Sequence, residues 1–285
     1  LFATTATATS IFGTNATFTN ATTGNLFATT ATTTNLYASV ATVANNISMG
    51  GSLLKTNVTV LSIVNNSVAL GGLALPNFTG NFGVGVGYLA LAALTTGDGN
   101  TAVGFKALAS TTTGIRNTAM GYNALNANIS GFENTAYGYE AAGLTTNTSV
   151  SAFGYQALAN NIISANSAFG AEALAANTTG SNNSAFGYRT LTRNSFGSRN
   201  VGFGNRALAT NTTGTDNAAF GFAALSLNTT GSSNIAMGSS ALLANTFGNR
   251  NLAIGEVSLF TNTTGNNNIS IGYYSLSSNI TGSDN

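Results

Sequence analysis

The carboxylates that come nearest to a catalytic pair are Glu133 and Glu140, seven residues apart. General acid–base or glycosidase chemistry needs two carboxyl groups with clustered partners, and neither residue has them. We interpret both as solvated surface residues and predict that the chain is not an enzyme.

A calcium-binding β-roll would need Asp at fixed places in every repeat, whereas Asp98, Asp216 and Asp284 are isolated, so no metal is expected.

Two further groups could carry chemistry. The glycine-rich segment 83–87 is similar to a phosphate-binding loop, but no lysine follows it and it falls on the repeat described below. The only local charge cluster is Arg189, Arg193, Arg199 and Arg206, in which Arg189 and Arg206 are spaced to lie one coil apart on one face. This cluster is a candidate contact for a receptor or glycan, although we favour solubilising charges on an otherwise neutral rod.

The composition excludes most other functions. The chain has no His, Cys or Trp, only 5% charged residues and a net charge of +1. It therefore lacks imidazole and thiolate chemistry, and no cofactor is expected. Its small net charge offers no field for nucleic acid or anionic membranes. No apolar run approaches the roughly 18 residues of a membrane span, so we expect no membrane contact by this segment.

A repeat of 17 residues, with two steps of 16, sets the architecture. Its unit reads Asn-x-Ala-x-Gly-x-x-Ala-Leu and then Asn-Thr-Thr-Gly. Such a short unit with two glycines has room for short strands and turns but not for two helices. The central glycines are Gly87, Gly104, Gly121, Gly138, Gly154, Gly170, Gly187, Gly204, Gly221, Gly238, Gly255 and Gly272. We therefore predict an all-β parallel solenoid of about twelve coils, stacked about 4.8 Å apart.

Two columns keep the register of the central glycine and are expected to form the core. One is a large apolar residue just before the glycine, and the other is a leucine four residues after it. The first column comprises Val103, Met120, Phe153, Phe169, Phe186, Phe203, Phe220, Met237, Ile254 and Ile271. The second comprises Leu108, Leu125, Leu158, Leu174, Leu191, Leu208, Leu225, Leu242, Leu259 and Leu276.

Asn-Thr-Thr-Gly is predicted to be a turn, since Asn can bond its own backbone and Gly can adopt positive φ. The turn glycines are Gly114, Gly131, Gly180, Gly197, Gly214, Gly231, Gly248 and Gly265. Several turns contain an Asn-x-Ser/Thr triplet, which at a surface is an acceptor for N-glycosylation. The candidates are Asn128, Asn177, Asn211, Asn228, Asn262 and Asn279.

A separate asparagine column stands four residues before the central glycine. Stacked in register, it is expected to form a side-chain amide ladder along the rod. It comprises Asn100, Asn117, Asn134, Asn166, Asn183, Asn200, Asn217, Asn234, Asn251 and Asn268.

The repeat resembles the head domain of YadA-like trimeric autotransporter adhesins, and related repeats occur in fibres of phages and large DNA viruses. The resemblance covers residues 46 to 285 and rests on Asn-Ser-Val-Ala-Leu-Gly at 66–71, Asn-Leu-Ala-Ile-Gly at 251–255 and Asn-Ile-Ser-Ile-Gly at 268–272. It implies a left-handed parallel β-roll that assembles as a homotrimer outside the cell, on a virion or cell surface.

The thinness of a 17-residue coil argues independently for association, because one coil buries too little apolar surface to offset its ordering entropy. The candidate contacts between chains are two columns, one of aromatic residues after the central glycine and one of alanines before the large apolar residue. They comprise Phe105, Tyr122, Tyr139, Tyr155, Tyr188, Phe222 and Tyr273, with Ala119, Ala136, Ala152, Ala168 and Ala185.

We divide the chain into a Thr/Ala-rich β stem or shaft (1–45), irregular transition coils (46–82) and the regular β-roll (83–285). A structural, non-catalytic surface fibre or adhesin segment is the expected function. One alternative is a self-assembling extracellular filament or surface-layer component that stacks end to end. The other is an ice-binding solenoid, although a flat Thr-x-Thr strand face is missing.

Overall fold

The computed structural model describes residues 52–55, 58–64 and 66–285, which fall into two units divided between Val64 and Asn65. The stem expected at 1–45 lies outside the described residues. In the first unit β2 (Ser52–Lys55) pairs antiparallel with β3 (Val58–Val64), with a register shift between Leu53 and Leu54. This pairing differs from the parallel coils that follow in the second unit.

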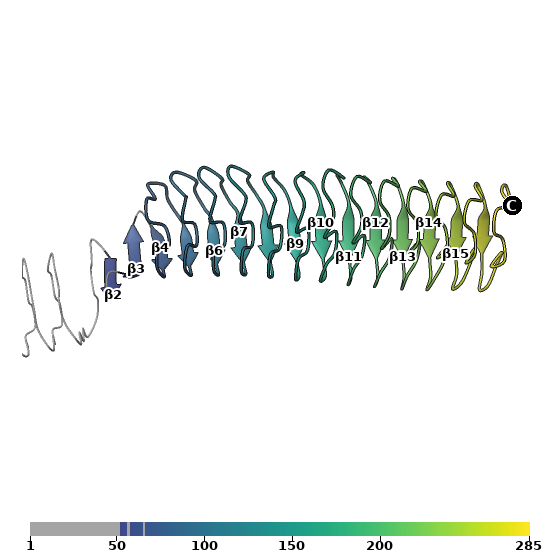
Figure 1. Ribbon diagram of the computed structural model, residues 1–285, viewed down its shortest axis with the longest axis horizontal. Coiled ribbons are helices and arrows are strands. Elements are labelled where there is room, and N and C mark those ends of the chain that lie inside the picture. Colours follow the sequence, from purple (N-terminus) through teal and green to yellow (C-terminus); the bar gives the residue numbers. More distant parts are fainter. Residues whose placement is uncertain (1–51, 56–57, 65) are drawn as a thin grey trace, which may run out of the picture. The chain divides into compact units, whose positions relative to one another are not determined.

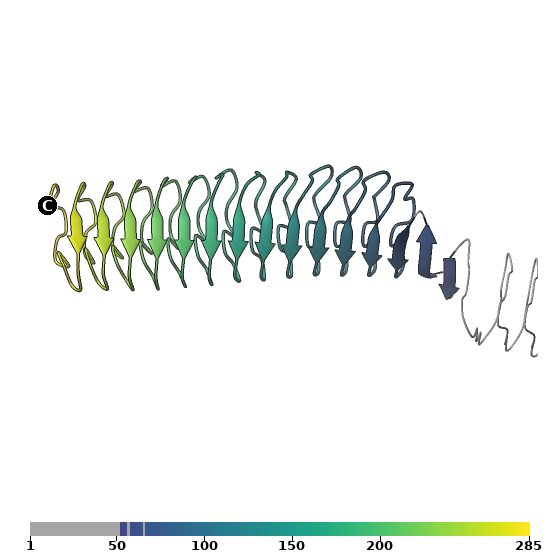
Figure 2. The ribbon, with the colours of Figure 1, turned by 180° about the vertical axis from the view of Figure 1, so that it is seen from behind.

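The second unit is a parallel β-solenoid, as the 17-residue period predicts. Each of its short strands pairs in register with the strand of the next coil, so Thr101 lies beside Thr118 and Val103 beside Met120. Figures 1 and 2 show the strands side by side in chain order from two opposite directions. No helix occurs in this unit. The strands are β4 (Ser67–Leu70), β5 (Val84–Val86), β6 (Thr101–Val103), β7 (Thr118–Met120), β8 (Thr135–Tyr137), β9 (Ser151–Phe153), β10 (Ser167–Phe169), β11 (Ser184–Phe186), β12 (Val201–Phe203), β13 (Ala218–Phe220), β14 (Ile235–Met237), β15 (Leu252–Ile254) and β16 (Ile269–Ile271).

The interior of the solenoid is filled by small residues and by one leucine per coil. The middle residue of each strand, such as Ala102 or Ala119, is fully buried, as are the Ala and Leu of the segment after the central glycine. The predicted leucine column is inaccessible to solvent from Leu108 to Leu259, whereas Leu276 in the last coil is partly exposed. Among residues 83–285 the hydrophobic core contains alanine, leucine and one valine but no aromatic ring.

The large apolar column before the central glycine does not lie in the core, contrary to expectation. Successive residues of a strand point to opposite sides, so a strand whose middle alanine is buried turns its first and third residues outward. Met120, Phe203, Phe220, Met237 and Ile271 are exposed, with Phe203 at 56%. The other five, Val103, Phe153, Phe169, Phe186 and Ile254, are half-buried. The alanines expected between chains (Ala119, Ala136, Ala152, Ala168 and Ala185) lie inside the coil instead.

The two glycines of the repeat serve different purposes. Central glycines have φ between 119° and 139°, a region essentially reserved for glycine, and a Cβ on Gly104 would lie 2.5 Å from the carbonyl oxygen of Gly121. The turn glycines were predicted to need positive φ, but none of the eight has it. They are required for space, since a Cβ on Gly114 would lie 2.6 Å from the carbonyl oxygen of Gly131.

Candidate functional site

The predicted asparagine column forms a buried amide ladder inside the solenoid. The Asn117 side chain donates from Nδ2 to Asn100 Oδ1 (3.0 Å) and to the Gly131 carbonyl (2.8 Å). Its own Oδ1 accepts from the backbone N and from Nδ2 of Asn134, both at 3.0 Å. Each such amide therefore has its donors and its acceptor satisfied, which makes its burial tolerable. The ladder is interrupted at Val150, which stands where the register expects Asn.

A second asparagine ladder runs along the turns, and the sequence analysis missed it. Asn211 Nδ2 donates to Asn194 Oδ1 (2.7 Å) and to the Gly214 carbonyl (3.0 Å), and Asn228 repeats this one coil later. The signal was present, because an asparagine stands seven residues after nine of the twelve central glycines. We had placed turn residues at the surface, whereas in a coil this narrow the turn side chain points inward.

This second ladder contains the residues predicted as glycosylation acceptors, and the folded chain does not expose them. Asn128, Asn177, Asn211, Asn228 and Asn262 have no solvent-accessible surface, and Asn279 is half-buried in the last coil. Where the ladder is continuous, the nitrogen that would carry a glycan is a hydrogen-bond donor to two interior oxygens. The surface position expected for these asparagines is therefore wrong for the five buried residues, while their glycosylation stays a prediction.

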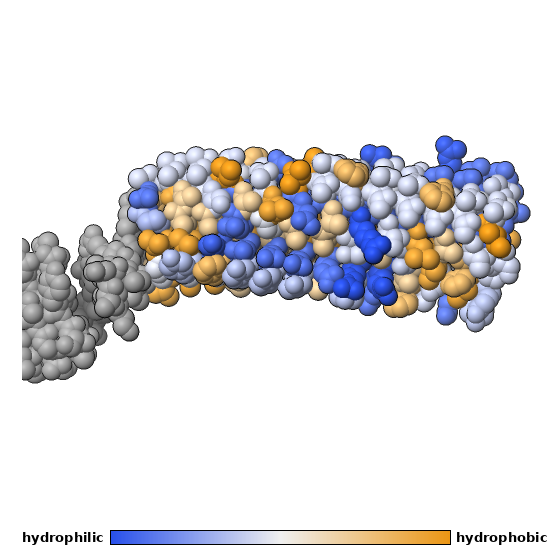
Figure 3. Space-filling view, viewed as in Figure 1, coloured by the Kyte–Doolittle hydropathy of each residue, from blue (hydrophilic) through white to orange (hydrophobic). Residues whose placement is uncertain are grey.

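The surface most suited to recognition is the outer sheet face, by which we mean the first and third residues of β5–β16. No charged or amide side chain occurs on it. The third residue is large and apolar in every strand, and the first changes from Thr or Ser in β6–β11 to Val, Ala, Ile or Leu in β12–β16. Figure 3 shows one side of this unit, on which apolar side chains (orange) are interspersed with polar ones (blue).

Aromatic side chains stack along the coils in two columns. The outer sheet face carries Tyr137, Phe153, Phe169, Phe186 and Phe203, whose successive ring centroids are 4.7 to 5.5 Å apart. The column after the central glycine carries Tyr88, Phe105, Tyr122, Tyr139 and Tyr155 at 4.9 to 5.8 Å. Since the ring faces contact one another, the columns offer their edges to a partner.

Three ion pairs join charged residues of adjacent coils. Glu133 pairs with Arg116 at 3.2 Å, while Glu140 accepts a hydrogen bond from Gln156 at 2.8 Å, so the two carboxylates do not act together. Of the arginine cluster, Arg189 pairs with Glu172 and Arg199 with Asp216. Arg193 and Arg206 are exposed. The negative charge of Glu140 raises the pKa of Tyr139 above its ordinary value of 10.0.

We expect the stability of the array to depend weakly on pH. The hydrogen bond from Arg199 lowers the pKa of Asp216 below its ordinary value of 3.8. This pair therefore stabilises the fold above about pH 4, and its contribution is lost as the pH falls through the folded-state pKa. The unfolding midpoint should be nearly constant from pH 8 to 5 and fall slightly by pH 3. That fall should be smaller in Asp216→Asn, and an unchanged fall would contradict the assignment to this pair.

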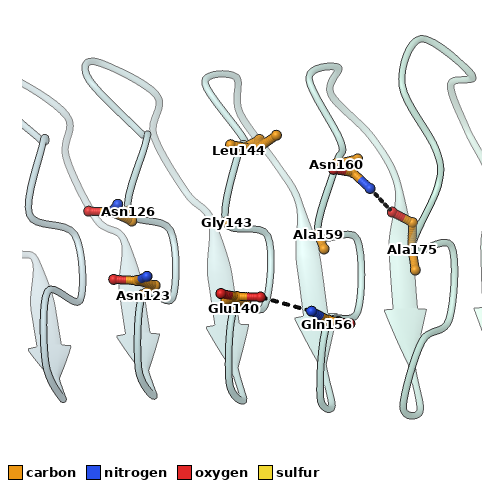
Figure 4. A pocket seen from close by; sticks show the side chains of 9 residues that line it. All are labelled: Asn123, Asn126, Glu140, Gly143, Leu144, Gln156, Ala159, Asn160 and Ala175. Carbon is orange, nitrogen blue, oxygen red and sulfur yellow. Dashed lines mark hydrogen bonds between the residues drawn. The ribbon is translucent and has the colours of Figure 1, made fainter.

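A shallow groove interrupts the surface at the coils of β7 to β10. It has a volume of about 330 Å³ and is lined by polar side chains, among them Asn123, Asn126, Glu140, Gln156 and Asn160. Figure 4 shows Glu140 and Gln156 joined by their hydrogen bond, with Gly143 beside them. Its residues belong to the strand-free segment after the central glycine, away from the outer sheet face.

Together the in-register strands, buried amide ladders and repeated glycines define the class of protein as a parallel β-solenoid. The chain matches no protein-family model, no curated protein and no solved structure. Within the described part of the chain, no group of three His, Cys, Asp or Glu side chains is placed to hold a metal ion. The same part contains no helix of the length and apolarity that crossing a bilayer requires.

Proposed function

We propose that this chain is a segment of a non-catalytic surface fibre or adhesin, in which copies associate laterally into a rod outside the cell, on a virion or cell surface. The observation that carries the proposal is the outer sheet face, which extends over β5–β16 without a charged residue. Monomeric soluble proteins rarely leave apolar patches above a few hundred Å² uncovered. The number of three chains is what the resemblance to trimeric adhesin heads implies.

A second copy of the same chain is the partner that fits this face. Its side chains form ridges repeated at the coil rise of about 4.8 Å, and a partner with the same rise matches them along the whole array. Two such faces pack like the sheets of a sandwich, about 10 Å apart. The exposed aromatic column after the central glycine borders the face and extends the contact. On this face, Thr and Ser alternate with large apolar residues, which does not favour the ice-binding alternative.

The test replaces outward residues that contribute nothing to the interior. Phe203→Glu with Phe220→Glu should convert an assembly of three times the 28.6 kDa chain mass into folded monomer, because two charges would be buried between chains. Sedimentation equilibrium measures the mass, and far-UV circular dichroism shows that the strands remain. The matched control is Phe196→Glu, an exposed turn residue off the sheet face, which should leave the assembly intact.

Two results would count against the proposal. A wild-type chain that sediments as a folded monomer at all concentrations would exclude lateral association. Endless filaments in electron micrographs, unaffected by the Phe203 and Phe220 changes, would favour the self-assembling filament or surface-layer alternative.

A further inference from the structure

The repeat departs most from its regular pattern at the coil of β8 and in the step that follows it. The central glycines Gly138, Gly154 and Gly170 are separated by 16 residues, and Ala142 stands where the other coils have leucine. Both asparagine ladders are interrupted in this coil, the first at Val150 and the second at Thr145. Departures from a regular sequence pattern occur at functional sites more often than elsewhere, because a purely structural repeat does not need an irregular coil.

Unsatisfied polar atoms gather at the same place. Within residues 66–285, the buried side-chain oxygens and nitrogens without a hydrogen-bond partner are Asn123 Oδ1, Asn128 Oδ1 and Thr145 Oγ1. All three belong to the coil of β8 or to the coil before it. An unpaired buried acceptor costs free energy, so this part of the array carries a local cost that the regular coils do not have. Of the three residues, Asn123 lines the groove.

Gly143 lines the groove and adds no side chain to it. The position five residues after the central glycine is Asn126 in the preceding coil and alanine in the two coils that follow, whereas Leu243 and Phe260 occupy it further along the chain. A Cβ on Gly143 would meet no atom closer than 3.3 Å, so the backbone does not require glycine here. Figure 4 shows Gly143 in the coil between those of Asn126 and Ala159, with the Leu144 side chain next to it in the chain.

The lining chemistry is that of a site for hydroxyl groups. Four side-chain amides and the carboxylate of Glu140 present donors and acceptors over three consecutive coils, while Leu144, Ala159 and Ala175 add small apolar patches. Such alternation matches a pyranose ring, which has hydroxyls at its edge and C–H groups on its faces. Glu140 is the only charged group in the lining, and its negative charge disfavours polyanions.

We infer that this groove binds a neutral, linear oligosaccharide lying along the solenoid axis. Successive sugar units would meet equivalent positions of successive coils, with the amides of Asn126 and Asn160 contacting some of the hydroxyls and Glu140 accepting from another. The site lies off the outer sheet face, so the inference does not depend on the number of chains that associate.

The test uses saturation-transfer NMR and calorimetry on the whole chain. The probes are hexasaccharides of β-1,4-linked glucose, β-1,4-linked N-acetylglucosamine and α-1,4-linked glucose, with a sulfated hexasaccharide as the polyanion. We expect one or more of the neutral probes to bind and the sulfated one not to bind. Gly143→Leu should weaken binding at least tenfold by filling the groove, and Asn126→Ala should weaken it several-fold.

The control is Ser226→Leu, which places the same side chain at the equivalent position of a coil outside the groove. Because Leu243 is accommodated at this position, both leucine variants should fold, which circular dichroism checks. Binding that survives Gly143→Leu, or the failure of all three neutral probes to bind the wild-type chain, would overturn the inference. So would tighter binding of the sulfated probe.

Discussion

Replacement of Asn217 by alanine is expected to lower the free energy of unfolding by about 2 to 4 kcal/mol, because it opens the first ladder in the middle of the array. Asn217 Oδ1 is the acceptor for the backbone N–H of Asn234 (3.0 Å), which would be left buried without a partner. The substitution also removes the donors to Asn200 Oδ1 and to the Gly231 carbonyl. A denaturant titration followed by circular dichroism measures the loss.

Asn205→Ala is the matched control for this prediction. Asn205 is exposed, so its truncation should change stability by less than about 0.5 kcal/mol. Because a solenoid is stabilised by nearest-neighbour contacts, hydrogen exchange in the Asn217→Ala variant should rise first in the coils of β12 to β14. Equal effects of the two substitutions would show that the ladder does not stabilise the fold.

If the chain is produced in a secretory pathway that attaches N-glycans, we expect the folded molecules to lack glycans on the second ladder and the glycosylated molecules not to fold. A glycan on Asn177, Asn211 or Asn228 would replace interior hydrogen bonds and could not be enclosed within the coil. Peptide mass mapping should find these residues unmodified in the soluble, protease-resistant fraction. Modified chains should appear in the aggregated fraction, and blocking glycan transfer should raise the soluble yield several-fold.

The triplet Asn182-Asn183-Ser184 supplies an internal control, since Asn182 is exposed and its side chain bonds only to Ser181. A glycan at Asn182 should be compatible with folding. Detection of a glycan on Asn211 in soluble protein that resists protease would contradict the inward placement of the second ladder.

The sequence was sufficient for the architecture because the repeat constrains it at every coil. A period of 17 residues with two glycines selects short strands over helices, and identical registers place like residues beside one another. The parallel solenoid is confirmed, Leu108 lies in the interior as expected, and Asn117 belongs to the amide ladder predicted for its column. The groove at Gly143 was not foreseen, although the irregular spacing and the exceptional Ala142 both mark its coil.

The error about the large apolar column has a physical origin. In the strand Ser184–Phe186, Phe186 is more apolar than Ala185, so the sequence pattern favours burying Phe186. The structure buries Ala185 instead, because the interior of the coil is thin. The same thinness turns Asn211 inward from a segment that has the composition of an exposed turn. Sequence patterns give the alternation of a strand but not the distance between the two layers it encloses.

What the sequence determined by itself was the repeat, the strand in each coil and the register of its columns, since these depend on spacing along the chain. Only the tertiary structure decided which columns of side chains face the interior. It also decided that Leu108 adopts φ of 51°, a conformation that leucine disfavours on its own. Closing a coil of 17 residues around two alanines and one leucine requires that turn, and the buried contacts of the stacked coils hold it in place.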